Sequence, residues 1–151
     1  MPKREFLTED EEKRIVDAIA SAENRTTGEI RVHIEFKCRK DPLARAKKVF
    51  HMLEMNQTDA RNGVILYIAT DDRKVAVYGD VAISEKVEDN FWQDEIDTLI
   101  SEFKENRFAE GIEKVVGDIG EKLREFFPGE GTDPNELSDE ITFEDNRNSD
   151  V

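Results

Sequence analysis

Residues 61–80, with the sequence RNGVILYIATDDRKVAVYGD, contain two apolar runs separated by a short polar segment. The first run, residues 64–69, is rich in β-branched and large apolar side chains, and the second, residues 74–79, is shorter. Because Asp71 and Asp72 suit a tight turn between two strands, this pattern predicts an antiparallel β-hairpin. The remaining elements of the chain can be placed relative to this hairpin.

The pairing of this hairpin brings its two open ends together. With residues 71 and 72 as the loop, pairing continues outward until residues 62 and 63 lie beside residues 79 and 80. We expect several oxygen-bearing side chains near this edge of the sheet: Asp59, Asn62, Asp80, Glu85, Glu88 and Asp89. Hard divalent cations bind such oxygens, so one or two metal ions could be held here. On the residues alone, the simpler alternative is favoured, namely that these residues only cap a helix and solvate the end of a loop.

The length and charge of the chain limit its class. Its 151 residues suit one domain with a real core, and 22 basic against 36 acidic residues give a net charge of −14. This charge disfavours binding to nucleic acid or to an anionic membrane, although it could equally serve solubility alone. Without a signal-like segment or a long apolar run, we expect a soluble, cytoplasmic protein. A single cysteine, Cys38, excludes an internal disulfide.

The segments before the hairpin predict a helix, a strand and a second helix. Thr8 and Glu11 have capping-box spacing, so a helix is expected to run from there to about residue 23. Residues 29–36 alternate polar and apolar, which predicts a strand with one buried face. Asp41 followed by Pro42 predicts the start of a helix that ends near residue 53. The two strands that flank this helix are expected to be parallel.

Two helices and an acidic tail are expected after the hairpin. Ser84 is a suitable N-cap for a helix with Glu85 and Glu88 in its first turn, and residues 108–126 form the last helix. We therefore expect a domain over residues 1–127. The segment 128–151 carries eight acidic residues and one basic residue, which predicts a partly disordered tail. Within the tail, residues 140–143 could add a short edge strand.

Motifs that would identify an enzyme are missing from the sequence. There is no glycine-rich phosphate loop, no Gly-x-Ser-x-Gly elbow, no His-Glu-x-x-His and no Asp-x-Asp. The two histidines lie on separate predicted elements, which leaves little material for a catalytic triad. A non-catalytic role is favoured, and the question of enzymatic activity stays open.

Two stretches of the hairpin resemble those of the TPM domain family, which occurs in thylakoid, nematode and many bacterial proteins. They are Asn-Gly-Val-Ile-Leu at residues 62–66 and Asp-Arg-Lys at residues 72–74, before a strand that ends in Gly79. The resemblance implies an α/β/α sandwich around a small mixed sheet of about four strands. It also implies divalent-cation binding, often of calcium, by acidic residues on loops at one end of that sheet.

The resemblance leads to one main expectation and two alternatives. The main expectation is a stand-alone, monomeric TPM domain that binds calcium, or else magnesium or manganese, in a structural or regulatory role. Because some plant-type relatives are described as acid phosphatases, the first alternative is a weak metal-dependent phosphatase, with Arg61 beside the ion. The second alternative is a module that binds a protein partner through the acidic tail.

Overall fold

A computed structural model of the chain describes residues 6–129, 141–144 and 146. In this part of the chain, four strands form one mixed sheet with the order β3-β2-β1-β4. The strands are β1 (Glu29–Glu35), β2 (Gly63–Ala69), β3 (Lys74–Gly79) and β4 (Thr142–Glu144). β1 pairs in parallel with both β2 and β4, whereas β3 pairs antiparallel with β2. The expected small mixed sheet and the parallel arrangement of β1 and β2 are confirmed.

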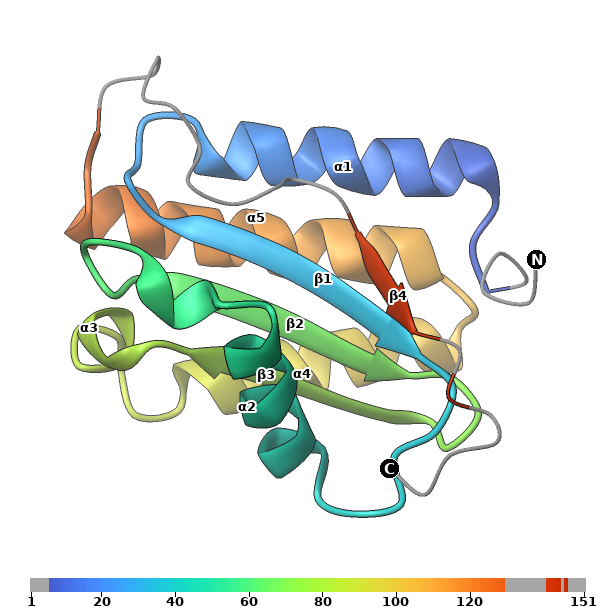
Figure 1. The fold of residues 1–151 in the computed structure, drawn as a ribbon. Helices are drawn as coiled ribbons and strands as arrows, with labels where there is room; N and C mark the ends of the chain where they lie inside the picture. The colour runs from blue at the N-terminus through green and yellow to red at the C-terminus, as the bar shows by residue number, and fades with distance from the viewer. Residues whose placement is uncertain (1–5, 130–140, 145, 147–151) are drawn as a thin grey trace.

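Helices cover both faces of the sheet and give a three-layer α/β/α sandwich (Figure 1). One layer contains the helices α1 (Glu9–Glu23), α4 (Phe91–Lys104) and α5 (Phe108–Phe126). The opposite layer contains α2 (Pro42–Met52) and a short 3₁₀ helix, η2 (Met55–Gln57). A single-turn helix, α3 (Val81–Ser84), directly follows the hairpin. The sandwich implied by the sequence is therefore present.

The first two helices begin where their capping residues predict. The Glu11 amide donates to the Thr8 hydroxyl at 3.1 Å, and the Thr8 amide donates to the Glu11 carboxylate at 2.9 Å. At the start of α2, the Ala44 amide donates to the Asp41 carboxylate at 2.9 Å. These bonds satisfy amide groups that the first turn of a helix leaves without partners, so both helix starts are locally encoded.

The prediction that Ser84 begins a helix is wrong. Asp80 caps the single turn of α3, and Ser84 is its last residue, with its hydroxyl donating to the Gly79 carbonyl at 2.8 Å. The next helix, α4, begins at Phe91. An aspartate directly after a strand competes successfully for the cap, because the chain turns immediately as the hairpin ends. Consequently Glu85 and Glu88 lie between α3 and α4 rather than in the first turn of a helix.

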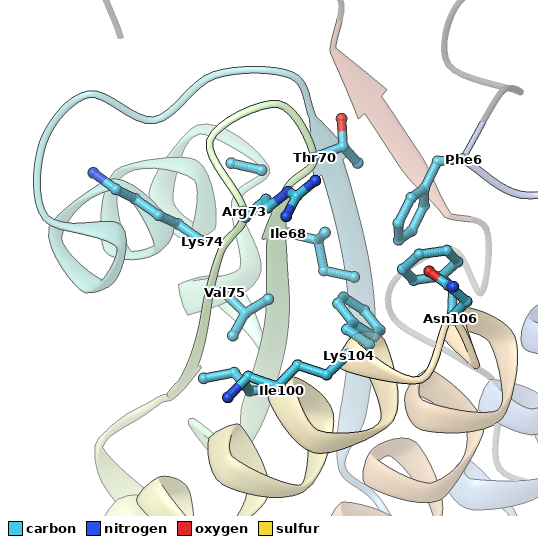
Figure 2. Close-up of a pocket in the computed structure, with 12 residues that line it drawn as sticks. Phe6, Ile68, Thr70, Arg73, Lys74, Val75, Ile100, Lys104 and Asn106 are labelled. Atoms are coloured by element: carbon cyan, nitrogen blue, oxygen red, sulfur yellow. The ribbon is translucent and has the colours of Figure 1, made fainter.

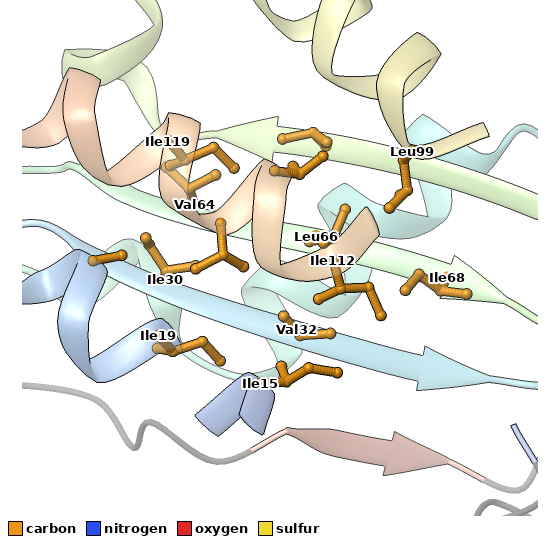
Figure 3. Close-up of a cluster of buried hydrophobic side chains, with 14 of the residues drawn as sticks. Ile15, Ile19, Ile30, Val32, Val64, Leu66, Ile68, Leu99, Ile112 and Ile119 are labelled. Carbon is orange, nitrogen blue, oxygen red and sulfur yellow. The ribbon is translucent and has the colours of Figure 1, made fainter. Parts of the chain in front are cut away.

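The sheet separates two apolar clusters. On the α1, α4 and α5 side, Val64, Leu66 and Ile68 of β2 pack with residues such as Ile112, as Figure 3 shows. On the α2 side, Ile65 and the other alternate residues of β2 pack against α2 and η2. All seven residues of β2 are buried, which explains why the strand is a continuous apolar run in the sequence.

The expectation that β1 has one buried face is wrong, because all seven of its residues are buried. β1 lies between β2 and β4, and helices cover the sheet on both sides. On the second face, which alternation left as either exposed or covered by a helix, Arg31, His33 and Glu35 are only 7%, 5% and 0% exposed. A buried polar face requires compensating partners, and those of Glu35 are described below.

The expected edge strand in the tail is present as β4, which begins two residues later and ends one residue later than expected. β4 pairs with the end of β1, with His33 opposite Thr142 and Glu35 opposite Glu144. Beyond it, the Asn146 side chain accepts hydrogen bonds from the Phe36 and Lys37 amides at 2.8 and 2.9 Å. The disorder expected elsewhere in the tail falls on residues 130–140, 145 and 147–151, which lie outside the described residues.

Candidate functional site

The open end of the hairpin brings together the two loops that the sequence indicated. The register pairs Val64 with Gly79, and the Asp80 amide donates to the Gly63 carbonyl at 2.9 Å. One step further, the Ala82 amide donates to the Arg61 carbonyl at 3.1 Å. The predicted convergence of the backbone is confirmed, so both loops are fixed to each other by main-chain hydrogen bonds.

Asp80 is the buried carboxylate at this edge, with only 1% of its surface exposed. Its Oδ1 accepts from the Val81 amide at 2.7 Å, which caps α3. The Arg61 guanidinium donates to both carboxylate oxygens, from Nε to Oδ2 at 2.8 Å and from Nη2 to Oδ1 at 2.9 Å. This two-point geometry is the stronger form of an arginine–carboxylate pair, and it supplies the positive charge that a buried carboxylate requires.

Arg61 is itself an exposed and conformationally unusual residue. Its side chain is 46% exposed, whereas that of Asp80 is 1% exposed. Its backbone has φ 52°, in the left-handed region that residues with a Cβ adopt at an energetic cost. The positive charge beside Asp80 therefore comes from the Arg61 side chain, which contacts solvent. The backbone of Arg61 has a conformation that residues with a Cβ rarely adopt.

Asn62, the residue after Arg61, is completely buried. Its side chain donates to a partner outside the Asp80–Arg61 pair. Its Nδ2 donates to the Thr27 hydroxyl, which lies ahead of β1, at 3.0 Å. Its Oδ1 is buried and has no hydrogen-bond partner among the described residues. A buried amide oxygen without a donor is energetically unfavourable and is also an oxygen ligand of the kind that calcium binds.

The other four predicted ligands are exposed on the two loops. Asp59 lies in the loop before Arg61, while Glu85, Glu88 and Asp89 lie between α3 and α4. Among the residues that the structure describes, no group of three or more His, Cys, Asp or Glu side chains is arranged to hold a metal ion. The fit to a cation is therefore partial: Asp80 and Asn62 offer buried oxygens, and the four exposed acids are near them in the chain.

The comparisons with known proteins identify the family. A family model described as the TPM domain matches residues 2–122, which is most of the chain. The chain belongs to the TPM domain family. No curated protein matches the sequence. Within the described residues of this TPM domain, no helix has both the length and the apolar character that crossing a bilayer requires.

Two solved structures resemble this TPM domain. The BA42 protein from the psychrophilic bacterium Bizionia argentinensis is 41% identical and has a TM-score of 0.85, with 95% of this chain and 100% of that chain covered. The N-terminal domain of a protein from P. gingivalis is 16% identical and has a TM-score of 0.67, with coverage of 80% and 78%. The second similarity concerns the fold alone.

A buried ionic cluster that the sequence analysis did not identify lies near the opposite end of β1. Glu35 is 0% exposed and accepts from Arg45 at 2.8 and 2.9 Å and from the Tyr67 hydroxyl. His33 Nε2 lies 3.0 Å from the Glu35 carboxylate. Arg45 also donates to Glu144 at 2.7 Å, so the cluster connects α2, β1, β2 and β4. Arg45 is itself buried.

The electrostatics of this cluster favour a charged Glu35. Burial alone would raise the pKa of Glu35, but hydrogen bonds from His33, Arg45 and Tyr67 outweigh burial and lower the pKa to about 2. Burial and the hydrogen bond to Glu35 raise the pKa of Tyr67, so Tyr67 stays a neutral donor. Tyr67 was the one feature of β2 in the sequence that could have indicated this buried cluster. A buried tyrosine in an otherwise aliphatic strand needs a partner for its hydroxyl.

A buried carboxylic acid between α4 and α5 gives a prediction about stability and pH. Burial, followed by a hydrogen bond with Asp118, raises the pKa of Glu95 from 4.5 to about 8. The folded state therefore holds the proton more tightly, and stability falls as pH rises from about 4.5 to about 8. Glu95→Gln should raise the free energy of unfolding at pH 9 by roughly 1–2 kcal/mol and have little effect at pH 4.5. Urea denaturation at the two pH values checks this.

The matched control for this prediction is Asp97→Asn, which alters an exposed carboxylate on the same helix. It should leave the pH dependence unchanged, because this side chain is exposed to solvent in the folded state as it is in the unfolded state. A Glu95→Gln variant with the same stability profile as the wild type between pH 4.5 and 9 would contradict the assignment.

Proposed function

We propose that this TPM domain binds a divalent cation, calcium in preference to magnesium or manganese, at the open end of the β2–β3 hairpin. The observation that carries the proposal is the buried carboxylate of Asp80, 1% exposed, whose charge is balanced by the half-exposed Arg61 side chain. The role is structural or regulatory: the cation would connect the two loops on either side of the hairpin.

The proposal depends on what Arg61 does when a cation is present. A buried carboxylate needs a positive counter-charge, and either a guanidinium or a metal ion can supply it. Arg61 can leave Asp80 for solvent because its side chain already contacts water and its backbone is in the left-handed region. Arg61 would therefore compete with the metal ion for Asp80, and its release is part of metal binding.

The remaining ligands would come from the predicted set. Asn62 Oδ1 is buried and has no donor among the residues that the structure describes, and coordination would satisfy it. Asp59, Glu85, Glu88 and Asp89 are exposed, so one or more of them could reach a cation without breaking a buried contact. When bound, the ion would reduce repulsion among these carboxylates and stabilise the folded state in proportion to its concentration.

The other functions considered from the sequence stay predictions. No contact described above favours the metal-dependent phosphatase or partner binding through the acidic tail. The cytoplasmic location and the monomeric state expected from the sequence are likewise untested. Cation binding is preferred because Asp80 is a buried carboxylate and because the buried Oδ1 of Asn62 has no hydrogen-bond donor within the described part of the chain.

Calorimetric titration of the metal-stripped full chain with calcium tests this proposal. Asp80→Asn keeps a helix-capping side chain but removes the charge, so it should weaken calcium binding by about tenfold or more. Arg61→Gln removes the competitor and should tighten binding by roughly three- to tenfold. The two substitutions therefore change the affinity in opposite directions.

The control is Asp17→Asn, an exposed acid on α1, which should leave the calcium affinity unchanged. If Arg61→Gln and Asp80→Asn weaken calcium binding equally, the Arg61–Asp80 pair is only a structural contact. The proposal that Arg61 competes with calcium for Asp80 is then wrong. If no heat is released at millimolar calcium, magnesium or manganese, the domain does not bind a cation at this edge.

A further inference from the structure

A cavity of about 520 Å³ lies at the other end of the hairpin, beside its turn (Figure 2). It is formed by the chain around β2 and β3, by the end of α4 and the start of α5, and by Phe6 ahead of α1. Its volume is within the range of pockets that enclose small organic ligands. The cavity is separated from the proposed cation site by the length of the hairpin, so the two sites are independent.

The interior of this cavity is apolar and partly aromatic. Phe6, Phe103 and Phe108 contact one another, with ring centroids 4.8–5.8 Å apart. Ile68 and Val75, from neighbouring strands, line the side formed by the sheet. Aromatic and aliphatic side chains in this arrangement offer a surface for a hydrocarbon chain or an aromatic ring.

The opening of this cavity carries positive charge. Although 36 of the 151 residues are acidic, none of the residues that line the cavity is Asp or Glu. Arg73 lies at the hairpin turn and Lys104 at the end of α4, with Ile68 and Val75 between them in Figure 2. Both side chains belong to exposed residues, and neither forms an ion pair within the described ranges.

Two of the neighbouring charged groups, Lys74 and Asp72, have partners outside the cavity. Lys74 also lines the cavity, but its ammonium group donates to the Lys40 carbonyl at 3.2 Å and points away from the opening. Asp72 accepts a hydrogen bond from the Cys38 amide at 2.6 Å. Arg73 and Lys104 are therefore the two cations available to a ligand in this cavity.

We propose that the cavity binds a small amphiphilic carboxylate, such as a medium-chain or aromatic acid. The apolar body would contact Phe6, Phe103 and Phe108, and the carboxylate would lie at Arg73, beside the hairpin turn. Arg73 suits this role because a guanidinium binds both oxygens of a carboxylate in one plane. The overall negative charge of the protein would repel an anion elsewhere on the surface, so binding depends on the local positive charge of Arg73.

The test is a titration of the ¹⁵N-labelled full chain with octanoate, followed by amide chemical shifts. The matched neutral ligand is octanamide, which keeps the hydrocarbon chain and lacks the charge. Octanoate should shift amides in segments 68–75 and 100–108 and should bind about five- to tenfold more tightly than octanamide. The octanoate affinity should also fall as salt is added.

Substitutions distinguish this site from general hydrophobic binding. Arg73→Gln should weaken octanoate binding by roughly three- to tenfold and leave octanamide binding unchanged. Lys104→Gln, on the far side of Ile68 and Val75, should have a smaller effect on octanoate binding. Lys86→Gln, at an exposed position between α3 and α4, is the control and should have no effect. Asp80→Asn should bind octanoate as the wild type does, because the cation site is separate.

Three results would overturn the proposal. Equal affinities for octanoate and octanamide would show that the cations make no contribution. Absence of shifts in the two segments at millimolar octanoate would show that the acid binds elsewhere or not at all. Shifts in those segments that follow protein concentration without ligand would show that a second copy of the chain covers the cavity.

Discussion

Replacing Arg45 with methionine is expected to lower the free energy of unfolding by about 3–5 kcal/mol. The substitution keeps much of the length of the side chain but removes its charge and its donors. Glu35, which is 0% exposed, would lose two of its hydrogen bonds and its guanidinium partner. An uncompensated buried carboxylate is among the most destabilising defects in a folded protein, so urea denaturation at pH 7 should show a large effect.

The pH dependence of this effect identifies Glu35 as the cause. In the wild type the pKa of Glu35 is lowered to about 2, so its contribution to stability is present above about pH 4.5 and is lost as pH falls toward 2. The difference between wild type and Arg45→Met should therefore be largest at neutral pH and should shrink below pH 4.5. A constant difference across this range would show that packing, not the ion pair, explains the loss.

Two further variants serve as controls for Arg45. Lys48→Met makes the same kind of change at an exposed position of α2 and should alter stability by less than about 0.5 kcal/mol. The double variant Glu35→Gln/Arg45→Met removes both charges and should recover part of the loss, because no unpaired ion remains. Equal stability of the single Arg45→Met variant and the double variant would contradict the account of the cluster.

Replacing Gly120 with alanine is expected to lower the free energy of unfolding by roughly 2–3 kcal/mol. A Cβ at Gly120 would lie 2.7 Å from the Ala22 Cβ and 2.9 Å from the Ala22 Cα. Because the contact involves the backbone of α1, no flexible side chain can move to relieve it, and α1 and α5 must separate. Thermal denaturation should show a clear fall in the melting temperature.

Gly117→Ala is the matched control for Gly120, three residues earlier on the same helix. A Cβ at Gly117 has no atom within 4 Å, so only the helix propensity changes. Alanine should therefore stabilise the protein by about 0.5–1 kcal/mol at this position. Destabilisation by Gly117→Ala, or no effect of Gly120→Ala, would mean that the close packing of α1 and α5 is incorrectly described.

Local signals in the sequence were sufficient to predict much of the fold. The capping residues Thr8 and Asp41 define helix starts through bonds to nearby amides, and the turn at residues 70–73 determines the register of the hairpin. The predicted register also placed the two loops of the candidate site side by side, as the structure has them. These features depend on contacts between residues close in sequence, which a pattern can reveal.

Features that depend on distant partners could not be predicted in the same way. Glu35 and Arg45 are ten residues apart, and Tyr67 and Glu144 complete their cluster from other strands. Alternation in β1 indicated a single buried face, but the other face is buried as well, with Arg45 of α2 packed against Glu35. Likewise, the partner of Asp80 is Arg61, nineteen residues earlier, and nothing in the local sequence shows that this carboxylate is already paired.

Calcium titration of the ¹⁵N-labelled wild-type chain tests cation binding at the hairpin most directly, because it reports both binding and location. We expect saturable shifts of the amides in residues 59–63 and 80–89, with the Asn62 side-chain amide among the affected signals. Amides near the cavity at residues 68–75 should not move. No shift at millimolar calcium, or shifts confined to residues outside the two loops, would contradict the proposed site.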